Sequence, residues 1–410
     1  MHSAAGRSPL PHRACASCGA AGYRVCHHQE FIVPEGYPLP AAYDVVVCHR
    51  CGFVYADTPA TQRDYDWFYS EWSKYDDSTT ATGGGVVGDD AARLAATARD
   101  IAHVLPSKAS SILDAGCATG GLLSALRDQG FSAVAGLDPS PGCAVACRER
   151  GFQAYVGSIA PAPVHLPKFD CIVLSHVLEH VCDVPAFFAA TRGLLAPGGY
   201  LYIETPDAAR YENYLYAPFQ EFNTEHINHF SAQTLSNTAR RFGFQPIVTE
   251  QKVFQTSKEI YYPAVFGVFR DSSAEDGRPV IADRELPARI DAYIRRSAEQ
   301  MSSINQKLAT QLAHHKRIIV WGAGQLAMKL LTLPCLANIK VSAFVDNNPI
   351  LRGKRLAGAP IVSPKEIAGA SQPILIATLL HVDEIVTDIR RRGLANPIIQ
   401  LLPESSEAGR

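Results

Sequence analysis

Two pairs of cysteines near the N-terminus have the spacing of metal ligands. The first pair is Cys15 and Cys18 in "CASCG", and the second is Cys48 and Cys51 in "CHRCGFVYAD". Two thiolates three positions apart can turn toward one ion, and four sulfurs give Zn²⁺ the closed tetrahedral coordination of a structural site. We therefore expect a zinc ribbon that the metal stabilises, without an open position for catalytic water. Two pairs of thiols without a metal are the alternative, and the "CHH" of residues 26–28 offers a substitute ligand.

A second group of reactive side chains lies in "APFQEFNTEHINHFS", a segment too polar to be buried core. A histidine there can titrate near neutral pH and remove a proton from a hydroxyl group or from a carbon beside a carbonyl. We predict that His226 is this base and that Glu225 orients it, although a polar loop without catalytic function is the alternative. We expect His229 to support the site from behind, and Asn223 and Asn228 to satisfy the loop backbone.

A turn of small residues could bind a nucleotide. "DAGCATGG" follows the apolar "SIL" and precedes the helical "LLSALRDQGF", so Gly116 and Gly120 lie between a strand and a helix, where a ligand can approach the backbone. The strand "FSAVAGLDPS" ends in Asp138, about 24 residues after Asp114. A carboxylate at that place can bind both ribose hydroxyls of an adenosine.

Three further apolar strands follow at regular intervals. "AYVGSI" places Gly157 and Ser158 where an adenine edge would lie, "KFDCIVLSHVLEHV" runs from a strand into a helix, and "LLAPGGYLYIETP" is a turn and a strand. In the second of these, we expect His176 to be a helix-start or core residue. The alternation of helices and strands from about Ala91 indicates a doubly wound α/β sheet.

Together these motifs resemble the class I S-adenosylmethionine-dependent methyltransferases over roughly residues 91–244. That family has a D/E-x-G-x-G-x-G loop, a ribose-binding acid and a Pro-Gly-Gly turn at these intervals; here Ala118 stands at the middle glycine. The resemblance implies that Asp114 and Gly116 face the methionine end of the cofactor, and that Asp138 binds its ribose. A nucleotide-binding fold kept only as a scaffold is the alternative.

The C-terminal region contains a second glycine turn. "KRIIVWGAGQLAMKLL" holds Gly322, Gly324 and Ala327, and the next strand ends in Asp346, which imitates a dinucleotide fingerprint. An NAD-dependent oxidoreductase is therefore an alternative. The remaining residues suffice for only one mononucleotide-binding half, without the half that would hold nicotinamide. Both a bound nucleotide at this turn and a purely structural role stay open.

The order of these parts is similar to that of the three-domain sugar C-methyltransferases of deoxysugar biosynthesis. The resemblance implies a nucleotide-linked 4-keto-deoxysugar substrate, from which a base removes the proton beside the ketone so that the enediolate attacks the methyl group. It also implies that His226 is the base with Glu225 beside it, that His180 is a second active-site histidine, and that Tyr75 is the upstream tyrosine. Because "SHVLEH" is common to class I enzymes, O-methylation of a sugar or glycan hydroxyl remains a rival.

We predict four regions from these observations. They are a zinc-binding module (13–60), a methyltransferase domain (61–255), a linker with a packing helix (256–316) and a Rossmann-like α/β domain (317–403) that helps to form the substrate cleft. Tyr261 and Tyr262 either line that cleft or pack at a strand end.

The composition argues against several classes of partner. The 410 residues include 38 basic and 40 acidic side chains, for a net charge of −2. This balance lacks the basic excess that recruits nucleic acid or an anionic membrane, so a small molecule is the expected substrate. There is no apolar run near the roughly 20 residues of a membrane-spanning helix, and no signal-peptide core. We expect a cytoplasmic enzyme, monomeric or homodimeric.

Overall fold

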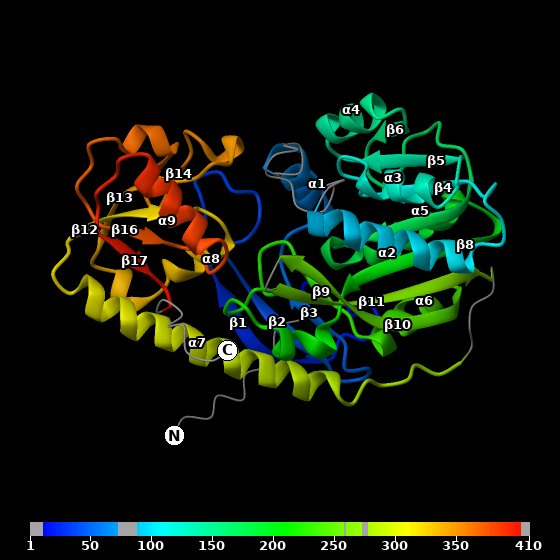
Figure 1. Cartoon of the computed structure of the whole chain (residues 1–410). Helices are drawn as coiled ribbons and strands as arrows, with labels where there is room; N and C mark the ends of the chain where they lie inside the picture. Colours follow the sequence, from blue (N-terminus) through cyan, green and yellow to red (C-terminus); the bar gives the residue numbers. More distant parts are fainter. Residues whose placement is uncertain (1–10, 73–87, 258–259, 273–277, 403–410) are drawn as a thin grey trace, which may run out of the picture.

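Three β-sheets and one long helix organise the chain. The structure is a computed structural model, and it describes residues 11–72, 88–257, 260–272 and 278–402. A seven-stranded and a six-stranded sheet lie on opposite sides, with a four-stranded N-terminal sheet between them (Figure 1). Helix α7 (Leu286–Leu312) passes along the N-terminal sheet toward the six-stranded sheet (Figure 1). Among the described residues, no helix is long and apolar enough to cross a membrane.

The seven-stranded sheet has the order β10-β11-β8-β7-β4-β5-β6. Strands β4 to β8 run parallel, and β11 is antiparallel to both of its neighbours, β8 and β10. The strand order reverses at β4, and in open α/β sheets ligands bind at such a point, outside the carboxyl ends of the strands. The turns after β4 and β7 are therefore where a site is expected. The strands are β4 (Ile112–Ala115), β5 (Val134–Asp138), β6 (Gln153–Val156), β7 (Phe169–Ser175), β8 (Leu195–Pro206), β10 (Phe244–Ser257) and β11 (Ile260–Asp271).

Helices cover both faces of this sheet. Ile112 packs with residues of α2 and α3, whereas the next residue, Leu113, packs with residues of α5 and α6. Alternate residues of one buried strand thus face different layers, as the period of a strand requires. The predicted Rossmann-like α/β core is confirmed. Its helices are α2 (Gly88–Val104), α3 (Gly121–Asp128), α4 (Pro141–Glu149), α5 (Val184–Leu194) and α6 (Ala232–Arg241).

The N-terminal sheet borrows a strand from the middle of the chain. Strands β1 (Tyr23–Glu30), β2 (Ala42–Cys48) and β3 (Val54–Asp57) form an antiparallel meander, and β9 (Asn228–His229) pairs with β3. Helix α1 (Gln62–Glu71) follows. Because β9 comes directly after the polar segment with His226, the cysteine module and that segment share one sheet.

The C-terminal sheet has the order β14-β15-β13-β12-β16-β17 and is parallel except for β14. Strands β16 and β17 lie on the other side of β12 from β13 and β15, so the sheet is larger than the single mononucleotide-binding half that the sequence predicted. Its helices are α8 (Gln325–Leu330) and α9 (Val382–Arg391). Apolar residues of α7 pack in one core with residues of β12 and of the N-terminal sheet. The strands are β12 (Arg317–Trp321), β13 (Lys340–Val345), β14 (Arg355–Leu356), β15 (Ala359–Val362), β16 (Ile374–Ile376) and β17 (Ile398–Gln400). Short 3₁₀ turns are η2 (Leu178–His180), η3 (Ala208–Tyr214), η4 (Pro334–Leu336), η5 (Pro349–Leu351) and η6 (Pro364–Ile367).

The seven-stranded sheet extends past the predicted domain end at residue 255. Strand β10 ends at Ser257 and strand β11 (Ile260–Asp271) completes the sheet, so the part of the predicted linker up to Asp271 that the structure describes is strand. The reason is pairing: β11 forms hydrogen bonds with both β10 and β8 and is therefore a central strand. The connection between the two α/β units therefore begins after Asp271 and includes α7 (Leu286–Leu312).

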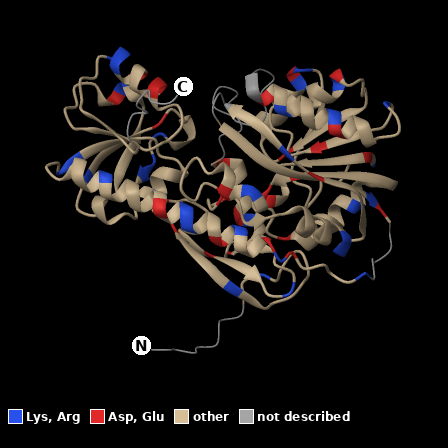
Figure 2. Cartoon of the chain, turned by 60° about the horizontal axis from the view of Figure 1, so that its bottom comes forward, with Lys and Arg blue, Asp and Glu red and all other residues tan. Residues whose placement is uncertain are grey.

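Charged residues of both signs are mixed over the helices (Figure 2). On α9, for example, Asp383 and Glu384 lie in the first turn and Arg390 and Arg391 in the last, which complements the helix dipole. The near-neutral net charge thus reflects local compensation.

Candidate active site

The glycine turn after β4 is held closed by Asp138. The Asp138 carboxylate accepts hydrogen bonds from the backbone N–H groups of Ala118 (2.9 Å) and Ser140 (2.9 Å). Gly116 has φ +83°, and a Cβ atom there would lie 2.6 Å from a methyl carbon of Val177. Glycine is therefore required at this position by both conformation and space.

Asp114 is buried in the floor of this turn, with only 2% of its surface exposed. Burial, together with the charge of nearby Asp138, raises the pKa of its carboxyl to about 7 against the opposing effect of Arg93. A cationic group bound against Asp114 would restore its charged form. A ligand with a positive charge near its centre fits this wall.

One cavity of about 480 Å³ contains most of the predicted site residues. The cofactor turn contributes Asp114 and Gly116, and the opposite wall contributes His180 and His226. Gly120 and Glu225 do not line it; Gly120 (φ +85°) instead caps α3. The predicted cofactor residues that line the cavity are Asp114, Gly116, Asp138, Gly157 and Ser158.

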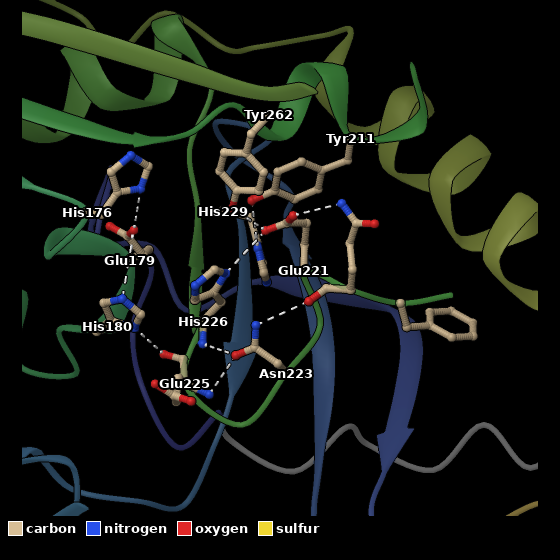
Figure 3. A network of polar contacts seen from close by, with 12 residues as sticks. His176, Glu179, His180, Tyr211, Glu221, Asn223, Glu225, His226, His229 and Tyr262 are labelled. Carbon is tan, nitrogen blue, oxygen red and sulfur yellow. Dashed lines mark hydrogen bonds and ion pairs between the residues drawn. The ribbon is translucent and has the colours of Figure 1, made fainter. Parts of the chain in front are cut away.

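Two histidines stand together in that cavity (Figure 3). The ring centroids of His180 and His226 are 4.9 Å apart. Nδ1 of His180 lies 3.0 Å from the backbone carbonyl oxygen of Glu225, and Nδ1 of His226 lies 3.2 Å from Oε2 of Glu221. With both Nδ1 atoms donating, Nε2 of each ring is left to accept a proton.

The acid beside His226 is Glu221 and not the predicted Glu225. Oε2 of Glu221 also accepts a hydrogen bond from the hydroxyl of Tyr262 (3.0 Å), whereas the Glu225 carboxylate lies 3.4 Å from the hydroxyl of Tyr69. Oδ1 of Asn223 accepts hydrogen bonds from the backbone N–H groups of Glu225 and His226 (2.9 and 2.8 Å). This tight turn gives the side chains of Glu225 and His226 different partners.

The surroundings shift the pKa values of the two histidines in opposite directions. Burial acts to lower the pKa of His226, but the hydrogen bond and charge of Glu221, together with Glu179 and Glu225, raise it overall. For His180, burial lowers the pKa, and the neighbouring His226 adds to this effect. Opposite shifts in adjacent groups are typical of acid–base pairs.

Glu179 and His176 are site residues that the sequence interpretation missed. Glu179 is 1% exposed, and its carboxylate makes no hydrogen bond to any described residue. It lies 3.3 Å from Nδ1 of His176 and 3.8 Å from Nε2 of His180. His176, predicted as a core or helix-start residue, lines the cavity with φ +56°. The spacing of His176, Glu179 and His180 in "SHVLEH" was the available signal.

Glu179, His180 and His226 present ligand atoms within 4.8 Å of one another. Such a set can hold a divalent cation. The Nε2 atoms of the two histidines are also the ones left to accept a proton, so proton transfer and cation binding are alternative uses of this set.

Comparison with known proteins identifies the segment that carries these residues. A family model described as "Methyltransferase domain" matches residues 89–250. These residues form a methyltransferase domain. Together with the strand order, the match gives the fold of class I S-adenosylmethionine-dependent methyltransferases. A second family model, "C2185-like, N-terminal", matches residues 314–399.

The curated relatives each match about a quarter of the chain. The ubiquinone biosynthesis O-methyltransferase of Methylobacterium nodulans is 34% identical over 113 residues, 26% of this chain and 45% of that protein. The tRNA U34 carboxymethyltransferase of Saccharophagus degradans is 32% identical over 117 residues, 26% and 35% of the two chains. The chain thus spans less than half the length of these relatives. A solved structure, the 1,6-didemethyltoxoflavin-N1-methyltransferase of Burkholderia thailandensis, is 17% identical with a TM-score of 0.38, over 55% of this chain and 95% of that one.

Next to the methyltransferase domain, the four predicted zinc ligands converge. The Sγ atoms of Cys15 and Cys51 are 3.6 Å apart, those of Cys18 and Cys48 are 3.5 Å apart, and all four lie within 4.8 Å of one another. Four Zn–S bonds of about 2.3 Å in a tetrahedron place the sulfurs about 3.8 Å apart, so the set fits zinc. The Sγ of Cys26 instead lies 3.2 Å from the carbonyl oxygen of Val45.

The other predicted residues have varied positions. Tyr75 lies outside the described residues. His229 is fully buried on β9 behind the cavity, with Nδ1 3.4 Å from the hydroxyl of Tyr211. Tyr262 lines the cavity, whereas Tyr261 is 51% exposed.

The C-terminal glycine turn repeats the geometry of the turn in the methyltransferase domain. The Asp346 carboxylate accepts hydrogen bonds from the backbone N–H groups of Ala323 and Asn348, both at 2.8 Å. The C-terminal unit also reaches the cavity, because Leu380 and His381 line it. A wall of the cleft is therefore built from this unit.

Proposed function

We propose that the chain is an S-adenosylmethionine-dependent methyltransferase that methylates a carbon atom of a nucleotide-linked keto-deoxysugar. The observation that carries the proposal is the single cavity that joins the cofactor turn at Asp114 and Gly116 to the His180–His226 pair. In that arrangement a base and a methyl donor can act on one acceptor molecule. Orientation of this kind is the main requirement of methyl transfer.

The cofactor turn fits S-adenosylmethionine. Asp114 would face the charged methionine end, Asp138 the ribose, and Gly157 and Ser158 the adenine edge. The buried Asp114 carboxyl, with its raised pKa, is stabilised by a positive ligand charge. The bound cofactor supplies an electrophilic methyl group on its sulfonium. We also propose a structural Zn²⁺ on Cys15, Cys18, Cys48 and Cys51.

Proton removal is proposed to begin at Nε2 of His226. Its Nδ1–H donates to Glu221, which fixes the ring tautomer and stabilises the imidazolium that forms when Nε2 takes the proton beside the ketone. The electrons left on carbon would give an enediolate, whose carbon would bond to the methyl group while the methyl–sulfur bond breaks and its electron pair stays on the sulfur of the departing S-adenosylhomocysteine. His180 stays neutral because its pKa is lowered, so the positive charge gathers on His226 alone.

The zinc module is proposed to support this base indirectly. Strand β3 pairs with β9, and the backbone N–H of Ala56 donates to the carbonyl oxygen of Ile227 at 2.9 Å. Ile227 directly follows His226. A zinc site that fixes the end of β2 and the start of β3 therefore holds the chain next to the base.

O-methylation of a sugar or glycan hydroxyl is the second candidate. Relatives of the methyltransferase domain carry the name ubiquinone biosynthesis O-methyltransferase, which favours an oxygen acceptor. In that case Nε2 of His226 would take a hydroxyl proton. The two candidates share the same residues and differ in whether a carbon-bound proton is exchanged.

Proton exchange in D₂O separates the two candidates. The enzyme is given nucleotide-linked 4-ketosugars without S-adenosylmethionine, and the NMR signal of the proton beside the ketone is followed. We expect exchange with the wild type and with the control variant His314→Gln, whose exposed histidine lies at the end of α7, and none with His226→Gln. Absence of exchange with every ketosugar, while calorimetry shows S-adenosylmethionine binding, would reject C-methylation in favour of O-methylation.

A further inference from the structure

The segment that carries the base is held from outside the methyltransferase domain. We call residues 219–227 the catalytic loop. Its backbone accepts a hydrogen bond from the hydroxyl of Tyr43 at the carbonyl of Asn223 (2.7 Å), and the N–H of Glu221 donates to the hydroxyl of Tyr293 (2.9 Å). Tyr43 belongs to the N-terminal sheet and Tyr293 to α7. The loop therefore depends on neighbouring units for its shape.

The C-terminal unit contacts this loop through a paired hydrogen bond. Nε2 of Gln325 donates to Oγ1 of Thr224 at 2.7 Å, and Oε1 of Gln325 accepts from the backbone N–H of Thr224 at 3.3 Å. Thr224 is 2% exposed, and Oγ1 also lies 2.7 Å from the hydroxyl of Tyr37. A single glutamine thus binds the side chain and the backbone of one buried residue at once.

Thr224 directly precedes the groups that hold both histidines. The next carbonyl, that of Glu225, accepts the hydrogen bond from Nδ1 of His180, and the following residue is His226 itself. A rotation of the backbone at Thr224 would therefore move the acceptor of one histidine and the Cα atom of the other. The spacing between His226 and Glu221 is sensitive to the same rotation.

Gln325 occupies a specific place in the C-terminal unit. It is the first residue of α8, directly after the Gly322–Gly324 turn, where a nucleotide-binding turn would meet a phosphate. Here its side chain is engaged with Thr224 instead, 101 positions away in the sequence. The turn has the form of a nucleotide site, yet its first helical side chain contacts a protein loop.

We propose that Gln325, presented by the C-terminal glycine turn, is a positioning residue that fixes Thr224 and through it the two active-site histidines. The proposal rests on the proposed function for the roles of these histidines. This role would let the C-terminal turn contribute to the reaction without binding a redox cofactor. The contact also makes the C-terminal unit part of the active site, in addition to the wall formed by Leu380 and His381.

The test uses the full-length protein labelled with ¹⁵N-histidine, and needs no substrate. The pKa of His226 is measured by NMR titration of its ring nitrogens, assigned with His226→Gln. We expect Gln325→Leu and Thr224→Val each to lower this pKa by about one unit, because the ring moves away from Glu221. The double variant should shift the pKa by less than the sum of the two single variants, since both break the hydrogen bond between Gln325 and Oγ1 of Thr224.

Two controls separate positioning from a general loss of stability. Thr224→Ser keeps the hydroxyl group and should keep the wild-type pKa of His226. Gln372→Leu alters another glutamine of the same unit. Gln372 precedes β16 whereas Gln325 follows β12, and because these strands are parallel the two glutamines lie at opposite ends of the strands. We expect no shift there, and melting temperatures report whether each variant is folded.

The outcomes are distinct from those of the exchange experiment. A wild-type pKa of His226 in folded Gln325→Leu, or equal shifts in Gln325→Leu and Gln372→Leu, would overturn the proposal. If Gln325→Leu does not fold, Thr224→Val decides on the same criterion. A lowered pKa in an enzyme that shows no proton exchange would support the positioning role and reject only the proposed C-methylation.

Discussion

Replacing Glu221 by glutamine tests the base assignment most directly. The substitution keeps the size of a side chain that is 2% exposed and leaves the Tyr262 hydroxyl an oxygen to bond. It removes the negative charge 3.2 Å from Nδ1 of His226. Because that charge raises the pKa of His226, the variant should have a lower pKa and a weaker base.

The size of the effect follows from the lost contact. A hydrogen bond to a charged group contributes about 1.5–3 kcal/mol, which corresponds to about one to two pKa units, or a roughly 10- to 150-fold lower rate of proton abstraction. The direction in which the pH–rate profile shifts also follows from the lower pKa of His226. His226 must be neutral to act, so a lower pKa moves the acid limb of the pH–rate profile to lower pH while the plateau rate falls.

The assay is the exchange of the proton beside the ketone in D₂O, followed by NMR between pH 5 and 9. Glu250→Gln, an exposed glutamate on β10, is the matched control and should behave as the wild type. Glu225→Gln should lower the rate less than Glu221→Gln, because the Glu225 carboxylate contacts Tyr69 and not the His226 ring. A Glu221→Gln enzyme with an unchanged rate and acid limb would refute the reasoning.

Two further changes probe the cofactor turn and the cysteine cluster. Gly116→Ala places a Cβ atom 2.6 Å from a Val177 methyl carbon at φ +83°, so calorimetry should show that the affinity for S-adenosylmethionine falls by about tenfold or more. Gly151→Ala is the control, because Gly151 also has a positive φ but no atom lies within 4 Å of its added Cβ. An unchanged affinity in Gly116→Ala would mean that the cofactor does not use this turn. Cys48→Ser removes one of four converging thiols, so the measured zinc content should fall from about one ion per chain toward zero and the melting temperature should drop. A wild-type protein that contains no zinc and melts at the same temperature as Cys48→Ser would contradict the zinc assignment.

Much of the site can be read from local sequence. The glycine turn, Asp114 and Asp138 lie at strand ends, and a strand–turn–helix unit places them by its own geometry. The two cysteine pairs likewise form their halves of the cluster locally. Spacing within one unit of structure was sufficient to predict where these side chains lie, because few backbone conformations connect such elements.

The partners of the histidines could not be obtained in this way. The sequence favoured Glu225 because it adjoins His226. Adjacent side chains in a turn point in different directions, however, and it is the carboxylate of Glu221 that lies beside Nδ1 of His226. Tyr262 reaches Glu221 from 41 positions away, along the hairpin of β10 and β11. The end of the domain was misplaced for a related reason, since a strand becomes central only through the neighbours that pair with it.

The sequence by itself determined which groups could do chemistry: a glycine turn with acids at two strand ends, two pairs of thiols and a histidine-rich polar loop. Only the tertiary structure decided which carboxylate serves His226, that Glu179 lies buried between two histidines, and that Gln325 reaches across 101 positions to Thr224. The physical reason is that hydrogen-bond geometry is short-ranged and directional. Which distant groups satisfy it depends on how three sheets pack together.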